Sequence, residues 1–256
     1  MKMKSFTTTI AIATLCVSCF LTSCSKFTNL IIHSVAESED LSDVAPEDTV
    51  TIEKKMAFTG SFSHIHTEGG YDITLVQGNN AINFTGRKEY ADNAILKVSG
   101  DTLYISSKED RFCRGSYSIS VPAIKSIFTA GASDINAENF QQQANLDITT
   151  AGATDIDIKS SSFNDIMIAT SGAGDINVKS VLMRNLHLST AGAGDIKIER
   201  ITADTINATL NGAGELTASG NCKDFICNLN GAGDINIDKL NIANKNAKKV
   251  SNAINK

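Results

Sequence analysis

A short glycine motif recurs through the second half of the chain at nearly constant spacing. Successive copies lie 21, 20, 20, 20 and 19 residues apart. Self-similarity at such a period is typical of solenoids, in which each repeat forms one coil and buries its apolar side chains only against its neighbours. The repeat therefore predicts a stack of coils over residues 129–243. The six copies begin at Gly131, Gly152, Gly172, Gly192, Gly212 and Gly231, and each of these glycines is followed by Ala.

The spacing of small and apolar residues around each glycine predicts strands. Counted from that glycine, positions −6, −4, −2, +1, +4 and +6 are small or apolar, and a third pair follows near +9 and +11. Spacing of two on either side of a break indicates two strands joined at a corner, whereas a helix requires spacings of three and four. We therefore predict an all-β fold, a β-helix with about 20 residues per turn.

The corner predicts the roles of its own residues. Gly permits a positive φ where the chain bends. The Ala at +1 is the same in all six copies, and we predict that it points into the core, where a larger side chain would overfill the corner. Stacked coils place equivalent residues about 4.8 Å apart, so the aliphatic residues at +4 should form one apolar column. That column comprises Ile156, Ile176, Ile196, Leu216 and Ile235.

An acidic residue occupies position +3 of every copy, and stacking would bring these carboxylates close together. Repulsion in water costs roughly 1 kcal/mol per neighbouring pair. Two explanations are open: each carboxylate accepts a backbone N–H at the corner, which we favour, or the column binds cations such as Ca²⁺. We predict no metal site and no cofactor. The residues are Asp134, Asp155, Asp175, Asp195, Glu215 and Asp234.

The N-terminus predicts export and lipid attachment. Lys2 and Lys4 precede an apolar run that is too short for a good membrane span, which is typical of a secretory signal. The run ends in Leu-Thr-Ser before Cys24, which resembles a lipobox. We predict a lipoprotein signal over 1–23, acylation of Cys24 and a flexible tether over 24–50. The protein would then be an outer-membrane lipoprotein of the cell envelope, on its periplasmic or its surface face.

Residues 51–128 alternate like strands but lack the regular repeat. Examples are 71–76, 94–98 and 102–106, and one short helix is expected over 88–93. We expect less regular coils that continue the solenoid and shield one end from edge pairing. The tail, 244–256, is rich in Asn and Lys and should be a polar end cap or a frayed terminus.

Cysteine and histidine residues offer little chemistry. Three cysteines follow Cys24, and the favoured interpretation is buried free thiols, with a Cys222–Cys227 disulfide as the alternative. His64 and His66 share one strand face, and we interpret them as surface residues because zinc requires more ligands.

Charge and motifs exclude several function classes. Removing residues 1–23 removes two lysines and no acidic residue, which takes the net charge from −5 to −7. Nucleic-acid binding is therefore not expected. No nucleophile–base order or phosphate loop occurs, and catalysis needs one irregular cluster rather than acids repeated at every turn. We predict that the chain is not an enzyme.

These features together resemble one family. The lipobox, the strand-rich N-terminal segment and the Gly-Ala-Gly-Asp-Ile turns are similar to the auto-transporter adhesin, head GIN domain proteins of Bacteroidota, over about residues 52–240. The resemblance implies a right-handed β-helix, an envelope location and no catalytic residues. Ser133, Thr154 and Glu215 depart from the strictest motif without threatening the fold.

Three functions are weighed from this pattern. The first is an adhesin-like binding module whose partner is an unknown glycan or protein, and whose flat polar rows suit multivalent contacts. The second is an envelope scaffold that self-associates as a homo-oligomer. A polysaccharide-active enzyme is the least favoured. The membrane is contacted only through the N-terminal lipid.

Overall fold

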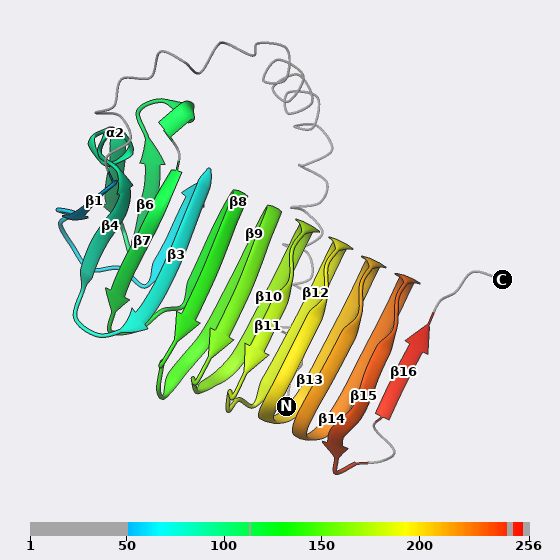
Figure 1. The fold of residues 1–256 in the computed structure, drawn as a ribbon. Coiled ribbons are helices and arrows are strands. Elements are labelled where there is room, and N and C mark those ends of the chain that lie inside the picture. Colours follow the sequence, from blue (N-terminus) through cyan, green and yellow to red (C-terminus); the bar gives the residue numbers. More distant parts are fainter. Residues whose placement is uncertain (1–50, 113, 245–247, 253–256) are drawn as a thin grey trace, which may run out of the picture. The chain divides into compact units, whose positions relative to one another are not determined.

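The computed structural model describes residues 51–112, 114–244 and 248–252 (Figure 1). The predicted signal peptide, Cys24, the tether and Cys113 lie outside the described residues. The described residues form one compact unit, in which their strands belong to a single sheet that winds into coils.

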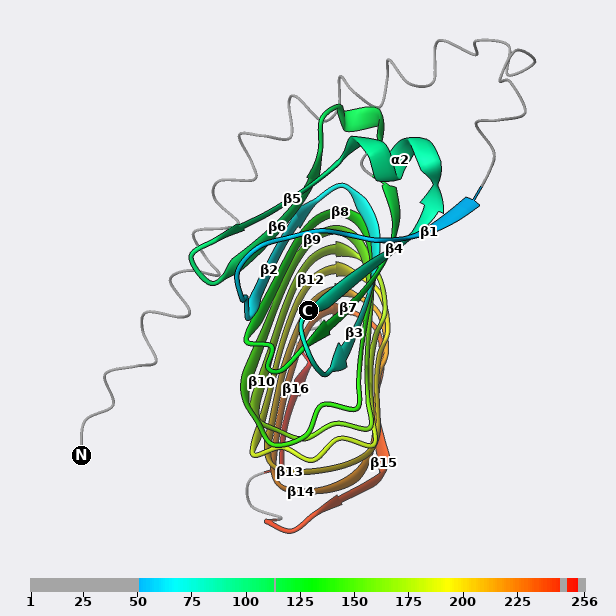
Figure 2. The same ribbon diagram turned by 90° about the vertical axis from the view of Figure 1, so that its left-hand side faces the viewer.

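The regular part is a stack of parallel coils, as the repeat predicts. Figure 2 looks along this stack and shows the coils superposed. Each coil has three faces, which we define by position: the first from −6 to −1, the second from +4 to +7, and the third from +9 to +12. The strands are β8 (Ser126–Glu138), β9 (Gln143–Lys159), β10 (Phe163–Ala173), β11 (Ile176–Lys179), β12 (Asn185–Ala193), β13 (Ile196–Ala213), β14 (Leu216–Ala232) and β15 (Ile235–Ile242).

The coils are in the predicted register. The six corner glycines pair in sequence order, from Gly131 with Gly152 to Gly212 with Gly231. The column at +4 pairs likewise and is closed to solvent in the interior coils, where Ile176 and Ile196 are each 1% exposed. Because no coil can bury its apolar residues alone, this column is what couples neighbouring coils.

Two further coils precede the regular stack. One consists of β2 (His64–Glu68) and β3 (Gly70–Gln77), which pair in parallel with β8. The other consists of β6 (Thr102–Ser107) and β7 (Arg114–Val121), which pair in parallel with β2 and β3. Within residues 51–128 these four strands thus form two coils that stack on β8. Their spatial order differs from chain order, because the later coil lies outside the earlier one (Figure 1).

Antiparallel strands close the N-terminal end of the stack. β4 (Ala81–Arg87) pairs with β7, β1 (Thr51–Lys55) pairs with β4, and β5 (Ala94–Ser99) pairs with β6. The expected helix is present as α2 (Lys88–Asn93), and a 3₁₀ turn, η3 (Asp110–Phe112), follows. Both strands of the outermost coil thus have a partner on their outer side, which removes the exposed edge.

The C-terminal end is built differently. β16 (Lys248–Asn252) pairs in parallel with the first face of β14, so the last coil consists of β15 and β16. The predicted boundary at residue 243 is therefore too early. The sequence did not predict this strand, because Val250 is the one apolar residue among its five residues and the others are Lys, Ser and Asn.

Candidate functional site

The glycine corner permits coils to stack at backbone contact. Gly192 has φ +142°, and a Cβ added there would lie 1.7 Å from the carbonyl oxygen of Gly172 in the preceding coil. The second glycine of the same corner, Gly194, has φ +149° and a Cβ there would meet the carbonyl oxygen of Gly174 at 2.0 Å. This corner has glycine at both positions because a positive φ and a close approach of backbones occur at each.

The alanines at +1 do not point inward, and that prediction is wrong. All six are exposed, whereas Ser133 and Thr154 at +2 are only 4% and 3% exposed. From the sequence we assumed that the alternation of inward and outward side chains is interrupted at the corner, between positions −2 and +1. In the structure the glycines turn the chain without changing which side faces the core, so positions −2, +2 and +4 remain inside. Ser133 accepts a hydrogen bond from the Thr129 hydroxyl at 3.0 Å, which satisfies a polar group in this interior.

The acidic residues at +3 form a ladder of hydrogen bonds between coils. Oδ1 of Asp155 accepts the backbone N–H of Asp175 at 2.8 Å, Asp175 does the same for Asp195, and Asp195 for Glu215. These charge-assisted hydrogen bonds are favourable and offset the repulsion along the ladder. All six acidic residues are exposed.

At the N-terminal end of the row of acidic residues, the ionised form of Asp134 is disfavoured. The pKa of Asp134 lies above its ordinary value, because partial desolvation and the charges of Asp72, Asp155 and Asp157 disfavour the ionised form.

Asp72 extends this row and was missed in the sequence. It pairs in register with Asp134, and Ile73 pairs with Ile135. Gly69 has φ +140° and its carbonyl oxygen lies 2.2 Å from a Cβ added at Gly131, so residues 69–73 form a seventh corner. This corner shares with the other copies a Gly followed three residues later by Asp-Ile. It differs from them because it has no Gly-Ala pair and has Tyr71 at +2, so the recurring Gly-Ala pair does not reveal it.

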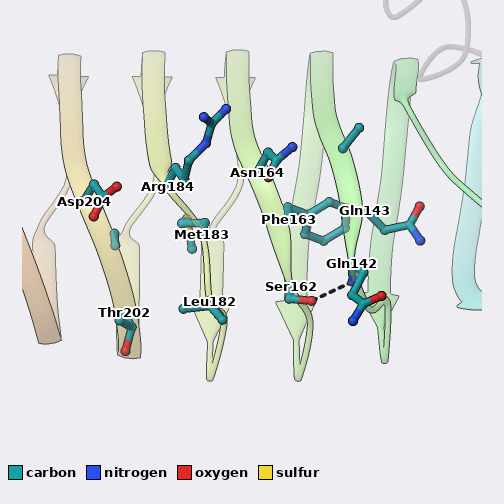
Figure 3. A pocket seen from close by; sticks show the side chains of 12 residues that line it. Gln142, Gln143, Ser162, Phe163, Asn164, Leu182, Met183, Arg184, Thr202 and Asp204 are labelled. Atoms are coloured by element: carbon teal, nitrogen blue, oxygen red, sulfur yellow. Dashed lines mark hydrogen bonds between the residues drawn. The ribbon is translucent and has the colours of Figure 1, made fainter.

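A shallow groove of about 610 Å³ follows the third face across four coils. Its lining comes from equivalent stretches of those coils: residues 142–144, 162–164, 182–184 and 202–204. Figure 3 shows these side chains along successive coils. Phe163 and Met183 are buried beneath it, while Leu182 is 57% exposed. Leu182 forms single β-bridges to Ser162 and Thr202 in the neighbouring coils, and its exposed side chain adds apolar surface to the groove.

Polar groups surround that apolar contact. The guanidinium of Arg184 lies 3.5 Å from the Asp165 carboxylate, and Asp204 pairs with Lys223 at 2.7 Å. The hydroxyl of Ser162 accepts the backbone N–H of Gln142 at 2.7 Å, which fixes the floor of the groove at one end (Figure 3). No motif in the sequence marks this groove, because it arises only when positions 20 residues apart are stacked.

Comparison with known families identifies the chain. The profile of the family described as "Putative auto-transporter adhesin, head GIN domain" matches residues 61–181 and 164–253, which together exceed half of the chain. The chain belongs to this family. Membership of an adhesin family indicates an envelope or surface protein. No curated protein matches the chain.

Solved structures share the GIN-domain fold. A putative adhesin from Bacteroides fragilis NCTC 9343 is 20% identical, with a TM-score of 0.59 over 73% of this chain and 97% of its own. A putative adhesin from Parabacteroides distasonis ATCC 8503 is 15% identical, with a TM-score of 0.65 over 74% of this chain and 83% of its own. At these identities the likeness concerns the fold.

The histidine pair of this GIN domain is held by local contacts. Nδ1 of His64 lies 2.6 Å from the Ser126 hydroxyl oxygen, and the His66 ring stacks on Phe128 with 4.6 Å between centroids. Within the residues that the structure describes, no cluster of three or more His, Cys, Asp or Glu side chains is placed to hold a metal ion.

Two cysteines of the GIN domain are buried free thiols, as the favoured interpretation predicted. Cys222 and Cys227 form no disulfide, and burial raises the pKa of each to about 11. Both therefore stay protonated at neutral pH and fill the core as small apolar groups. In the described part of the chain, no helix has the length and apolarity needed to span a membrane.

Proposed function

We propose that the protein is a non-catalytic, adhesin-like binding module of the cell envelope that holds an extended glycan in the third-face groove. The observation that carries this proposal is the groove itself, with exposed Leu182 at its centre and polar side chains on both sides. A concave surface with an apolar contact and a few convergent polar groups is the usual form of a binding site.

The lining suits the hydroxyl groups of sugars. It offers amide, guanidinium, carboxylate and hydroxyl groups from successive coils, and coils repeat at strand spacing, about 4.8 Å. A polymer that lies along the stack can therefore repeat similar weak contacts, and repeated contacts add avidity.

The same lining argues against glycoside hydrolysis. That chemistry uses two carboxyl groups on either side of the scissile bond. Among the twelve described residues that line the groove, Asp204 is the one carboxylate, and it pairs with Lys223. The groove therefore supports binding rather than cleavage.

The test is binding of the purified protein to a glycan array, followed by matched variants. Arg184→Ala removes an exposed cation from the groove, and Lys197→Ala removes one from the second face. Each loses one exposed ion pair, with Asp165 and with Glu199 respectively. We expect Arg184→Ala to weaken binding about tenfold, as for a charge-assisted hydrogen bond. We expect Lys197→Ala to leave binding unchanged, and equal losses in both variants would refute the groove.

We also infer that a lipid on Cys24 holds this module at the envelope, after removal of residues 1–23, with 24–50 as the tether. The lipobox supports this, since several acyl chains on one cysteine anchor firmly. Cys24→Ser should abolish incorporation of a labelled fatty acid and release the protein from membranes. Retention of both label and membrane association in that variant would contradict it.

A further inference from the structure

The two ends of the stack differ in how their strand edges are treated. At the N-terminal end, β4 and β5 pair with the outermost coil. At the C-terminal end, among the described residues, β15 and β16 pair only with β14, so their outer edges have no strand beside them (Figure 1). Several apolar residues of this last coil are correspondingly open: Ile235 and Ile237 are partly exposed, and Val250 is 45% exposed, whereas Leu240 is buried.

The repeat fixes which backbone groups point to this open edge. The N–H at position +4 donates to the following coil in Ile176, Ile196 and Leu216, with N···O distances of 2.8 to 2.9 Å. Ile235 is the next residue in that register, and its N–H therefore points outward.

The same holds on the third face of the last coil. The carbonyl of Cys222 accepts the N–H of Ala243 from the following coil, and Ile242 is in register with Cys222. The edge of β15 is therefore a row of donors and acceptors that extended backbone can complete.

The sequence of β15 is symmetric about the corner between Asp238 and Lys239. When the strand pairs antiparallel with a second copy of itself about that point, each apolar residue faces an apolar residue, each Asn faces an Asn, and Asp faces Lys. The facing pairs are Ile235 with Ile242, Asn236 with Asn241, Ile237 with Leu240, and Asp238 with Lys239.

We propose that the C-terminal edge is an interface between two copies of this chain, in which β15 pairs antiparallel with β15 of the second copy around a two-fold axis at the corner. The residues whose backbone points outward, such as Ile235 and Ile242, then face one another as hydrogen-bonded pairs. Their side chains continue the apolar core from one stack into the next.

Charge supports a second copy as the occupant. Asp238 and Lys239 are both exposed, and within the described residues neither has an ion-pair partner. Two-fold pairing brings each beside its opposite in the other copy, twice per interface. Because the N-terminal ends are capped, the association closes at a dimer instead of growing into a fibre.

Disulfide trapping in the full-length chain tests the register directly. Asn236 and Asn241 would face each other as a non-hydrogen-bonded pair, with Cα atoms about 4.5 Å apart, which a disulfide can span. The variant Asn236→Cys/Asn241→Cys, oxidised in membranes with copper–phenanthroline, should run mainly as a covalent dimer. Each single variant should link far less, since neither position faces itself.

The matched control places the same change on an interior coil. Asn177 and Leu182 occupy the same two repeat positions, +5 and +10, so Asn177→Cys/Leu182→Cys should give no more dimer than the native chain. The native chain sets the background from its own cysteines. Equal linking in the control, no dimer in the test variant, or linking mainly to another protein would each overturn the proposal.

A charge exchange across the interface provides a second test of the same pairing. In the trapping background, Asp238→Lys makes both cross-interface pairs repulsive and should lower the association constant by roughly two- to thirtyfold. Asp238→Lys/Lys239→Asp restores opposite charges and should recover the linked fraction. Loss in both variants would indicate damage to β15, and no change in either would overturn the pairing.

Discussion

Replacement of one corner glycine by alanine probes the feature on which the stack depends. In Gly192→Ala the new Cβ would lie 1.7 Å from the Gly172 carbonyl oxygen, whereas real Cβ atoms stay beyond about 3.0 Å. The two coils would have to separate by more than an ångström, or the corner would have to change its φ of +142°. Overpacking costs about 1–3 kcal/mol and a disfavoured φ costs about 1–3 kcal/mol, so we expect a loss of about 2–6 kcal/mol.

The assay is equilibrium unfolding in urea, followed by far-UV circular dichroism. With a slope of about 2 kcal/mol per molar urea, the expected loss lowers the midpoint by about 1–3 M. The matched control is Ala193→Leu, next in the chain and exposed, which should change the free energy of unfolding by less than about 0.5 kcal/mol.

The control also separates the structure from the sequence interpretation, which placed Ala193 in the core. That interpretation predicts overpacking and a large loss for Ala193→Leu. A destabilisation as large in Ala193→Leu as in Gly192→Ala would refute the outward corner, and an unchanged midpoint in Gly192→Ala would refute backbone contact between coils.

Other positions give smaller effects. Asp175→Leu should be less stable than Asp175→Asn by about 1 kcal/mol in urea unfolding, because only the amide oxygen still accepts the Asp195 N–H. The pKa of Asp134 is raised, so the folded state holds that proton more tightly than the unfolded chain. Asp134→Asn should therefore be more stable than the native chain at pH 7, and the difference should vanish as pH falls below about 4, where the native carboxyl is also neutral. Ser160 has φ +49° and is exposed, so Ser160→Gly should raise the melting temperature, equivalent to as much as about 1 kcal/mol.

The sequence was sufficient for the fold because one constraint repeats. Spacing of two around a glycine every 20 residues predicts strands, coils and the column through Ile176 and Ile196, all of which are present. The direction of the corner side chains was predicted wrongly, because the alternation of apolar residues in the sequence does not show whether a bend interrupts it. Ala193 is apolar and small, which suits either side, and only the φ of both neighbouring glycines decides between them.

Features that depend on non-local order could not be predicted in the same way. The coil at Tyr71 and Asp72 lacks the motif, and it neighbours β8 because the β6–β7 coil is placed outside it. The groove around Leu182 has no local signature, since its lining residues are separated by whole coils. Periodicity predicts which residues share a register, but exposure within a register follows from side-chain packing.

The distribution of repeated and unrepeated positions links the fold to the proposed binding site. At the corner, stacking at backbone contact leaves no freedom, so Gly recurs in every copy. At +10 on the third face, Ser162, Leu182 and Thr202 stack in register although they differ in chemistry, because their side chains point to solvent and only their backbones pair. Changes there leave the coil geometry intact while altering what the groove contacts. A β-solenoid can therefore keep one backbone and still vary its ligand, which is the property that a family of adhesin-like binding modules requires.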